Sequence, residues 1–263
     1  MPYFAHKYQI VKITVLGSGT SQGVPVIACS CDVCASTDTF DKRLRSSVLI
    51  ETATTTVVID AGPDFRQQML RAGVKKLDAI LITHTHKDHI AGLDDVRSFN
   101  YLTGKAVVVY ARPSDQLEIK QEFSYAFNEN PYPGVPEFDL RNLSTDQIQI
   151  GDLTIQPVEL KHMNLSVFGF RIGDFSYLTD VNFIPKESME ILRETQVLII
   201  DALRKKPHPS HFNLDQAIDV AQQLKIPQTY LTHISHLMGL HSVIEKELPK
   251  HINLAWDGLE IEI

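Results

Sequence analysis

The chain has 263 residues, of which 43% are hydrophobic, and its net charge is −7 at pH 7. This length supports a substantial core, and the acidic balance excludes an overall basic surface for nucleic acid. No apolar stretch is long enough to cross a membrane, and residues 1–7 lack the features of a signal peptide. We therefore expect a cytoplasmic protein without a membrane partner. No repeat or linker divides the chain, so we expect one domain over 1–263.

The N-terminal part combines a glycine-rich loop with a cysteine cluster. A strand predicted over 11–16 leads into Gly17–Gly23, where glycines indicate close backbone approach, with phosphate binding and a tight turn as open alternatives. Cys29, Cys31 and Cys34 follow as C-x-C-x-x-C, a spacing at which three thiolates can bind one Zn²⁺. An odd, clustered set argues against a disulfide framework and for a reducing compartment. Three reduced thiols without metal are the alternative.

Strands are predicted over 47–51, 56–60 and 79–82, with a helix over 64–72 that ends before Gly73. The basic segment 42–45 is interpreted as a solvated surface turn. Asp60 ends its strand either as a turn former or as a residue that orients a metal ligand.

The strand over 79–82 runs directly into the central motif of the chain. His84, His86, Asp88 and His89 read as H-x-H-x-D-H. Residues two apart in an extended segment face the same side, so His84 and His86 can bind one ion together. Asp88 and His89 lie past a turn and can face a second ion. Such a dense His/Asp cluster at a strand end favours a metal site over a chance His-rich loop.

The rest of the chain places single candidate side chains after apolar, strand-like runs. The predicted elements are strands over 106–110, 147–150, 153–160, 167–172, 175–178, 197–200, 229–232, 251–255 and 259–263, and helices over 114–128, 213–224 and 239–248. His162, Asp180 and His233 each follow one of these strands. Because strand-end loops build sites along one edge, we expect two packed sheets with a shared site. Asn213 with Gln216 predicts a capping box for the helix that follows.

In this order, the motif, His162, Thr179-Asp180 and His233 resemble the metallo-β-lactamase superfamily over nearly the whole chain. The resemblance implies an α+β fold, an αββα sandwich of two mixed β-sheets flanked by helices. It also implies two metal ions with one shared carboxylate. It assigns the ligands as His84, His86 and His162 for one ion, Asp88, His89 and His233 for the other, and Asp180 as the bridge.

A narrower resemblance is to the phosphodiesterase branch of the PhnP family, which opens a phosphoribosyl cyclic phosphate. It rests on Gly17–Pro25, the three cysteines, His211-Phe212-Asn213 and Thr232–His236. It implies a structural Zn²⁺ bound by the three cysteines and His236. It also implies His211 as the general acid.

We therefore expect a binuclear metal-dependent phosphodiesterase of a small-molecule diester, such as a small cyclic phosphate, in which two divalent metals, Mn²⁺ or Zn²⁺, activate a bridging hydroxide. His211 and Asp88 are the catalytic candidates, and Arg204, Lys205 and His208 are candidate substrate contacts.

The alternatives are a ribonuclease Z-like tRNA 3′-processing endonuclease, a glyoxalase-like thioester hydrolase, a PqqB-like protein and a non-enzymatic metal scaffold. The superfamily often dimerises, so a homodimer is among the expected partners.

Overall fold

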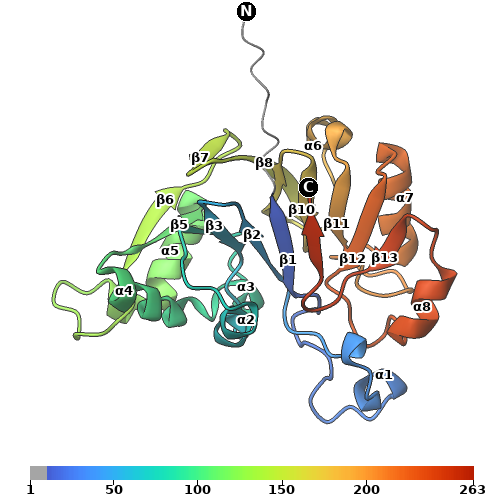
Figure 1. The fold of residues 1–263 in the computed structure, drawn as a ribbon, viewed down its shortest axis with the longest axis horizontal. Helices are drawn as coiled ribbons and strands as arrows, with labels where there is room; N and C mark the ends of the chain where they lie inside the picture. The colour runs from blue at the N-terminus through green and yellow to red at the C-terminus, as the bar shows by residue number, and fades with distance from the viewer. Residues whose placement is uncertain (1–10) are drawn as a thin grey trace, which may run out of the picture.

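The computed structural model describes residues 11–263, so the N-terminal segment 1–7 considered for a signal peptide lies outside the described residues. Its strands form two seven-stranded sheets, with helices on the outer side of each (Figure 1). The flanking helices of the first sheet are α2 (Phe65–Ala72), α4 (Arg97–Thr103) and α5 (Pro113–Glu122), and those of the second are α6 (Lys186–Ile191), α7 (Leu214–Leu224) and α8 (His241–Glu247) (Figure 1). This is the αββα sandwich expected from the sequence. Between residues 11 and 263, no helix has the length and apolarity needed to cross a bilayer.

The first sheet has the strand order β14-β1-β2-β3-β4-β5-β6. Its strands are β1 (Lys12–Gly17), β2 (Ser47–Glu51), β3 (Thr56–Ile59), β4 (Ala79–Leu81), β5 (Val107–Ala111), β6 (Phe138–Asn142) and β14 (Glu260–Glu262). The second sheet has the order β13-β12-β11-β10-β9-β8-β7. Its strands are β7 (Ile148–Ile150), β8 (Leu153–His162), β9 (Leu165–Ile172), β10 (Phe175–Leu178), β11 (Val197–Asp201), β12 (Gln228–Thr232) and β13 (Ile252–Leu254).

The helices are short and lie mostly between parallel strands. They are α1 (Asp32–Ala35), α2 (Phe65–Ala72), α3 (Lys87–Ile90), α4 (Arg97–Thr103), α5 (Pro113–Glu122), α6 (Lys186–Ile191), α7 (Leu214–Leu224) and α8 (His241–Glu247), with 3₁₀ turns at 39–41, 93–96, 124–126 and 192–194. The predicted capping box of α7 is present, since Asn213 and Gln216 each accept the other's backbone N–H.

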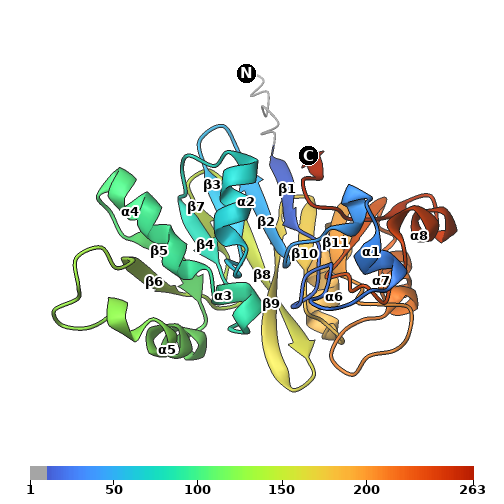
Figure 2. The same cartoon turned by 90° about the horizontal axis from the view of Figure 1, so that it is seen from below.

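Parallel pairing brings the carboxyl ends of many strands to one edge of the sandwich. β3, β4, β5 and β6 are parallel neighbours in the first sheet, as are β10, β11, β12 and β13 in the second. At this edge the backbone N–H of Phe168, in β9, donates to the carbonyl of Thr83, just past β4, at 3.0 Å. The two sheets are thus joined where the predicted ligands lie. Figure 2 looks onto this edge from below, with α3 near the centre of the view.

Aromatic side chains fill the space between the sheets. Phe168, Phe170, Phe175 and Tyr177 are fully buried there, together with aliphatic residues of β1, β2 and β3. Separate apolar clusters lie under the helices on each outer face. Every strand that leads to a candidate ligand is therefore fixed by packing on both faces.

Between residues 114 and 142 the structure differs from the elements predicted from the sequence. The helix expected over 114–128 ends at Glu122, where Phe123 leaves helical geometry with φ −104° and ψ 35°. Phe123 and Phe127 instead pack on Phe138, at 5.9 and 5.6 Å between ring centroids. Phe138 begins β6, a strand that the sequence pattern missed because its side chains are only half-buried or exposed.

The interpretation of segment 42–45 as a solvated turn is wrong. Arg43 is only 4% exposed, and its guanidinium donates to the hydroxyl of Ser18 and the carbonyl of Ala255. Burial lowers the pKa of Arg43 to about 10. A buried guanidinium is tolerated when its donors are satisfied, and here they tie the glycine-rich loop to the C-terminal strands.

Candidate metal centre

Seven His and Asp side chains meet at the shared edge of the two sheets. They form two clusters that have Asp180 in common, and within each cluster the candidate ligand atoms lie within 4.8 Å of one another. The clusters are His84, His86, His162 and Asp180, and Asp88, His89, Asp180 and His233. The structure therefore brings together all seven residues that the sequence proposed as catalytic-metal ligands.

Three site residues occupy strained backbone positions. Asp60, Asp180 and His233 follow β3, β10 and β12, with φ of 64°, 51° and 57°. Residues other than glycine rarely adopt this left-handed region, and such strain persists only where surrounding contacts hold it. Ending each strand in this conformation turns the side chain into the site at the point where the sheet stops.

The second nitrogen of several ligand rings is held by the protein. Asp60 Oδ2 lies 2.6 Å from His89 Nδ1, and Asp60 Oδ1 accepts from the backbone N–H of Thr83 at 2.9 Å. His162 Nδ1 lies 2.7 Å from the carbonyl of Ser210, so it donates there. Such partners set the tautomer and orientation of a metal-binding histidine. Asp60 therefore orients a ligand, the second of the two roles considered for it.

The charges of the site are strongly coupled. Burial lowers the pKa of His84 well below its usual value. Burial also opposes the charged form of His89, but Asp60, Asp180 and Asp88 outweigh it and raise the pKa of His89 well above the usual value. Asp180 is fully buried, yet the adjacent His233 and His89 hold its pKa well below the usual value. Without metal, protons on histidines thus compensate the carboxylates.

The residues present fit two divalent cations. Nε2 of His89 is buried and has no hydrogen-bond partner among residues 11–263, yet it lies 3.2 Å from Asp88 Oδ2 and 3.4 Å from Asp180 Oδ2. A cation between such atoms would replace the missing partner. Imidazole and carboxylate donors suit Zn²⁺, Mn²⁺ and Fe²⁺ alike. The donor set therefore fits a binuclear centre but leaves the identity of the metal open.

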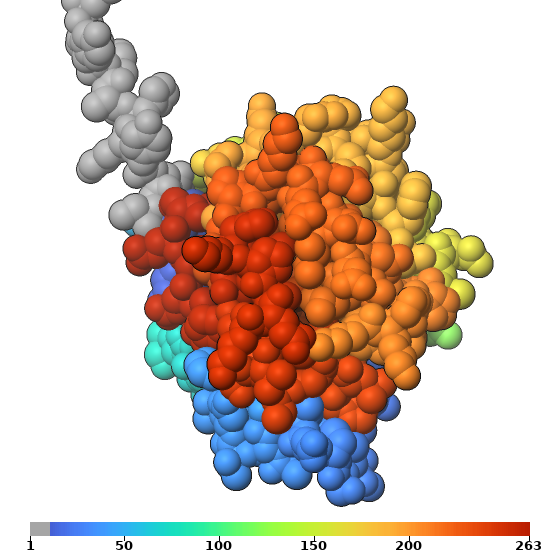
Figure 3. Space-filling view, turned by 90° about the vertical axis from the view of Figure 1, so that its right-hand side faces the viewer, coloured from blue at the N-terminus to red at the C-terminus, as the bar shows by residue number. Residues whose placement is uncertain are grey.

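The three cysteines meet His236 at a second cluster. Nδ1 of His236 lies 3.3, 3.4 and 3.6 Å from the Sγ atoms of Cys29, Cys31 and Cys34. The N–H of Cys34 and the ring of His236 lower the pKa of Cys31 to about 6, whereas burial raises the pKa of Cys34 to about 11. Four donors of this kind match a closed zinc site. In Figure 3 the early segment, in blue, lies against the late segment, in orange to red, at the lower end of this face.

His211 lies beside both metal clusters and is not a member of either. Its ring stacks on His233 at 4.7 Å between centroids and meets His162 edge-on at 4.6 Å. Nδ1 of His211 lies 2.8 Å from Oδ2 of Asp201, a fully buried carboxylate. Sequence reasoning did not assign a role to Asp201. The available signal was a carboxylate at the end of an apolar strand, ten residues before His211.

The basic segment before His211 has other partners. Lys205 Nζ forms an ion pair with Glu247 at 2.7 Å, and Arg204 donates to the carbonyls of Lys206 and Pro207. His208 lies nearer the centre, 5.2 Å from His211 between ring centroids. As substrate contacts, Arg204, Lys205 and His208 stay predictions.

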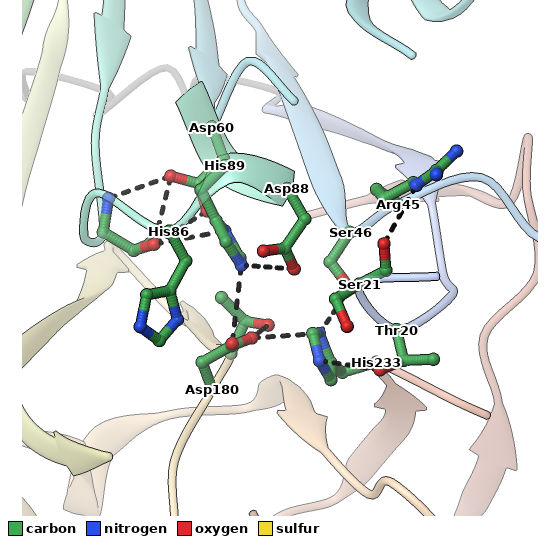
Figure 4. Close-up of polar contacts among 12 residues, drawn as sticks. Thr20, Ser21, Arg45, Ser46, Asp60, His86, Asp88, His89, Asp180 and His233 are labelled. Atoms are coloured by element: carbon green, nitrogen blue, oxygen red, sulfur yellow. Dashed lines mark hydrogen bonds and ion pairs between the residues drawn. The ribbon is translucent and has the colours of Figure 1, made fainter. Parts of the chain in front are cut away.

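The glycine-rich loop closely approaches the chain's own backbone. A Cβ atom at Gly17 would lie 1.9 Å from the carbonyl oxygen of Arg45, so only glycine fits. Past this contact, Thr20 lies next to His233, and Ser46 approaches the same ring from just before β2 (Figure 4). The close backbone approach inferred from the glycines is therefore present, and it places hydroxyl side chains beside a metal cluster.

Comparisons with known proteins agree with this geometry. The family profile described as "Beta-lactamase superfamily domain" matches residues 55–234. A solved structure described as "a New Diphosphatase from the PhnP Family" is 44% identical, with a TM-score of 0.90 and 97% of each chain covered.

Two curated relatives are also similar. The chain is 43% identical over 253 residues to an octanoyltransferase of Porphyromonas gingivalis, covering 95% of this chain and 51% of that protein. It is 29% identical over 134 residues to the ribonuclease Z of Bradyrhizobium diazoefficiens, covering 49% of this chain and 44% of that protein. The chain thus spans about half the length of these curated relatives.

Proposed function

The chain belongs to the β-lactamase superfamily and is a PhnP-like member of it, and from this premise we propose that it is a metal-dependent hydrolase of phosphodiesters. The observation that carries the proposal is the His211–Asp201 pair beside both metal clusters. A buried carboxylate that orients an imidazole is the arrangement of a proton donor, and phosphodiester cleavage needs one at its leaving group.

The seven clustered side chains would hold two divalent cations, with Asp180 between them and one three-residue set on each side. When bound, two such ions polarise the phosphoryl oxygens and lower the pKa of water. Two carboxylates, Asp88 and Asp180, would offset the repulsion between the cations. Except for His86, which is exposed, these side chains are at most 9% exposed, so the protein holds most of the donors in place.

His211 would supply the proton that the leaving group needs. Its Nδ1–H donates to Asp201, so the proton available to substrate sits on Nε2. When the bond from phosphorus to the leaving oxygen breaks, that oxygen takes the proton from Nε2, and the neutral ring later regains it from solvent. Asp201 also accepts from the backbone N–H of Val181 at 3.0 Å, which fixes the carboxylate in place.

The finer assignments belong to the same proposal. We propose a small cyclic phosphate as substrate, Mn²⁺ or Zn²⁺ at the paired clusters and structural Zn²⁺ at Cys29, Cys31, Cys34 and His236. The similar PhnP-family structure is described as a diphosphatase, which supports hydrolysis at phosphorus, whereas the choice of a cyclic phosphate follows from the sequence resemblance. The octanoyltransferase match does not extend the proposal to acyl transfer, because it covers 51% of that protein.

Ribonuclease Z activity is the second candidate, favoured by the 29% identity to the Bradyrhizobium enzyme. Against it, the chain has a net charge of −7, and Lys205 near the site is paired with Glu247. A long anionic RNA needs cationic side chains that are free to contact phosphates.

The test is a hydrolysis assay on the protein loaded with Mn²⁺ or Zn²⁺. We expect turnover of bis(p-nitrophenyl) phosphate and of a ribose 2′,3′-cyclic phosphate, and none by Asp180→Ala. A precursor tRNA with a 3′ trailer and a glutathione thioester serve as the arms for the two rival activities. Cleavage of either rival substrate, with both diesters left intact, would overturn the proposal.

A further inference from the structure

The loop Gly17–Gly23 has no part in the proposed reaction, yet one of its side chains contacts the metal centre. Thr20 is buried, and its Oγ1 lies 3.2 Å from Nε2 of His233 (Figure 4). We propose that Thr20 is a positioning residue that orients His233 for a metal ion. This inference rests on the binuclear centre of the proposed function.

His233 is oriented differently from the other buried ligand histidines. In those rings a protein oxygen holds Nδ1, and Nε2 faces the cluster. The Nδ1 contacts are His84 with Thr83 Oγ1 at 3.0 Å, His89 with Asp60 Oδ2 at 2.6 Å and His162 with the Ser210 carbonyl at 2.7 Å. In His233 the two nitrogens are exchanged. Its Nδ1 lies 2.9 Å from Oδ1 of Asp180, the carboxylate that both clusters share, and its Nε2 faces Thr20.

This reversed orientation of the His233 ring determines which ring nitrogen Thr20 must bind. A neutral imidazole carries one proton, so a ring that offers its Nδ1 lone pair to a metal carries the proton on Nε2. That N–H then donates to Oγ1 of Thr20. Without the hydroxyl, a buried N–H would have no acceptor, and the ring would be free to turn its lone pair away from the cluster.

The neighbouring hydroxyl of Ser46 does not take over this role. Ser46 Oγ donates to the carbonyl of Gly19 at 2.9 Å and lies 3.2 Å from Nδ1 of His233, on the side that faces the cluster. Thr20 is therefore the side chain that holds the far nitrogen of the ring.

The loop is rigid enough to hold the ring before any ion binds. The N–H of Thr20 donates to the carbonyl of Ile234 at 3.1 Å, and Arg45 Nε donates to the carbonyl of Ser21 at 3.1 Å (Figure 4). A Cβ atom at Gly19 would lie 2.9 Å from Cβ of Arg43, so glycine is required for this close packing. His233 itself has φ +57°, a conformation that needs such external support.

The test measures metal binding by the full chain, independently of any substrate. Zn²⁺ is titrated into the metal-free protein against a fluorescent chelator, and bound metal is counted by mass spectrometry. Thr20→Val keeps the shape and removes the hydroxyl, Thr20→Ser restores it, and Ser21→Ala is the control at an exposed position of the same loop. We expect Thr20→Val to weaken one of the two catalytic-site affinities by about 10–100-fold. Thr20→Ser and Ser21→Ala should both bind as the wild type does.

Two results would overturn the proposal. One is a metal affinity of Thr20→Val equal to that of the wild type. The other is an equal loss of metal affinity in Thr20→Val and Ser21→Ala, which would show that loop packing, and not the Thr20 hydroxyl, supports the site. If Thr20→Val fails to fold, Thr20→Ala and Thr20→Ser give the same comparison, since affinity must follow the hydroxyl. If the wild type does not bind two metal ions at the paired clusters, the proposed function itself is refuted. Failure of the Thr20 proposal and failure of the proposed function therefore give different results.

Discussion

Removing the charge of Asp201 while keeping its shape tests the proposed proton donor most directly. Both the ring of His211 and the N–H of Val181 bond to Oδ2, whereas Oδ1 is buried and finds no partner in the part of the chain that the structure describes. In Asp201→Asn the amide oxygen can occupy the Oδ2 position and accept both bonds, with the NH₂ group at the free position. The substitution therefore removes one negative charge and keeps both accepted hydrogen bonds, and its cost to folding is a buried NH₂ group without an acceptor.

The expected loss follows from the hydrogen bond that changes. A bond to a charged group contributes about 1.5–3 kcal/mol, against about 0.5–1.5 kcal/mol for a neutral one. The difference predicts a fall in kcat of roughly 10-fold on a ribose alkoxide, and complete loss of the donor in His211→Ala predicts about 10²–10⁴-fold. p-Nitrophenolate departs without a proton, so both variants should lose little activity on that leaving group.

The assay compares kcat on the two leaving groups for each variant, with bound metal counted in parallel. Asp219→Asn, at an exposed position of α7, is the matched control and should behave as the wild type. Equal losses on the two substrates would show that His211 positions phosphate and does not donate a proton. Loss of metal in His211→Ala would make it a ligand and refute the reasoning.

Three further predictions address the metal clusters. Asp180→Ala should abolish activity and lower the metal content below two catalytic ions per chain, because both clusters lose their shared carboxylate; two ions with normal turnover would contradict this. Cys31→Ser should release about one Zn²⁺ and lower the Tm while the folded fraction keeps its turnover, since structural zinc contributes to folding; loss of turnover at an unchanged Tm would place the cysteines in the active site. Burial opposes the charged ring of His233, but Asp180 outweighs it and raises the pKa of His233 to about 9. The protonated ring therefore stabilises the metal-free protein fully below pH 6.5, and this stabilisation is lost as the pH rises through 9. The Tm of the chelated protein should fall as the pH rises through this window, and the fall should be smaller in His233→Gln, where the raised pKa of His89 still contributes.

Local patterns in the sequence predicted two packed sheets and the clustered residues, and the family resemblance implied the αββα arrangement. H-x-H-x-D-H follows a buried strand within one short segment, and His162, Asp180 and His233 each follow an apolar run. Asp201 and Thr20 were missed as partners of His211 and His233 because their roles depend on tertiary contacts. Thr20 lies 213 positions before His233, and no pattern along the chain indicates which ring nitrogen it meets.

Arg43 was predicted to be solvated but is buried, again because its environment depends on tertiary contacts. A run of basic residues is usually solvated, and only the folded chain reveals the carbonyl and hydroxyl that satisfy a buried guanidinium. The strand β6 was missed because half-buried side chains give no clear alternation between apolar and polar positions. Local periodicity thus predicts which segments are strands, but not which distant segments cover them.

The division of the metal ligands between the two sheets has a mechanical consequence. His84, His86, Asp88 and His89 follow β4 in the first sheet, and His162, Asp180 and His233 belong to the second. Ions bound at both clusters would therefore act as cross-links between the two halves of the sandwich. Chelation would remove these links, and the halves would be held by protein contacts alone, among them the aromatic core, the Phe168–Thr83 hydrogen bond and the hydrogen bonds of Ser18 and Thr20 with Ile234. The same ions that would drive hydrolysis would then also tie the two halves of the sandwich together.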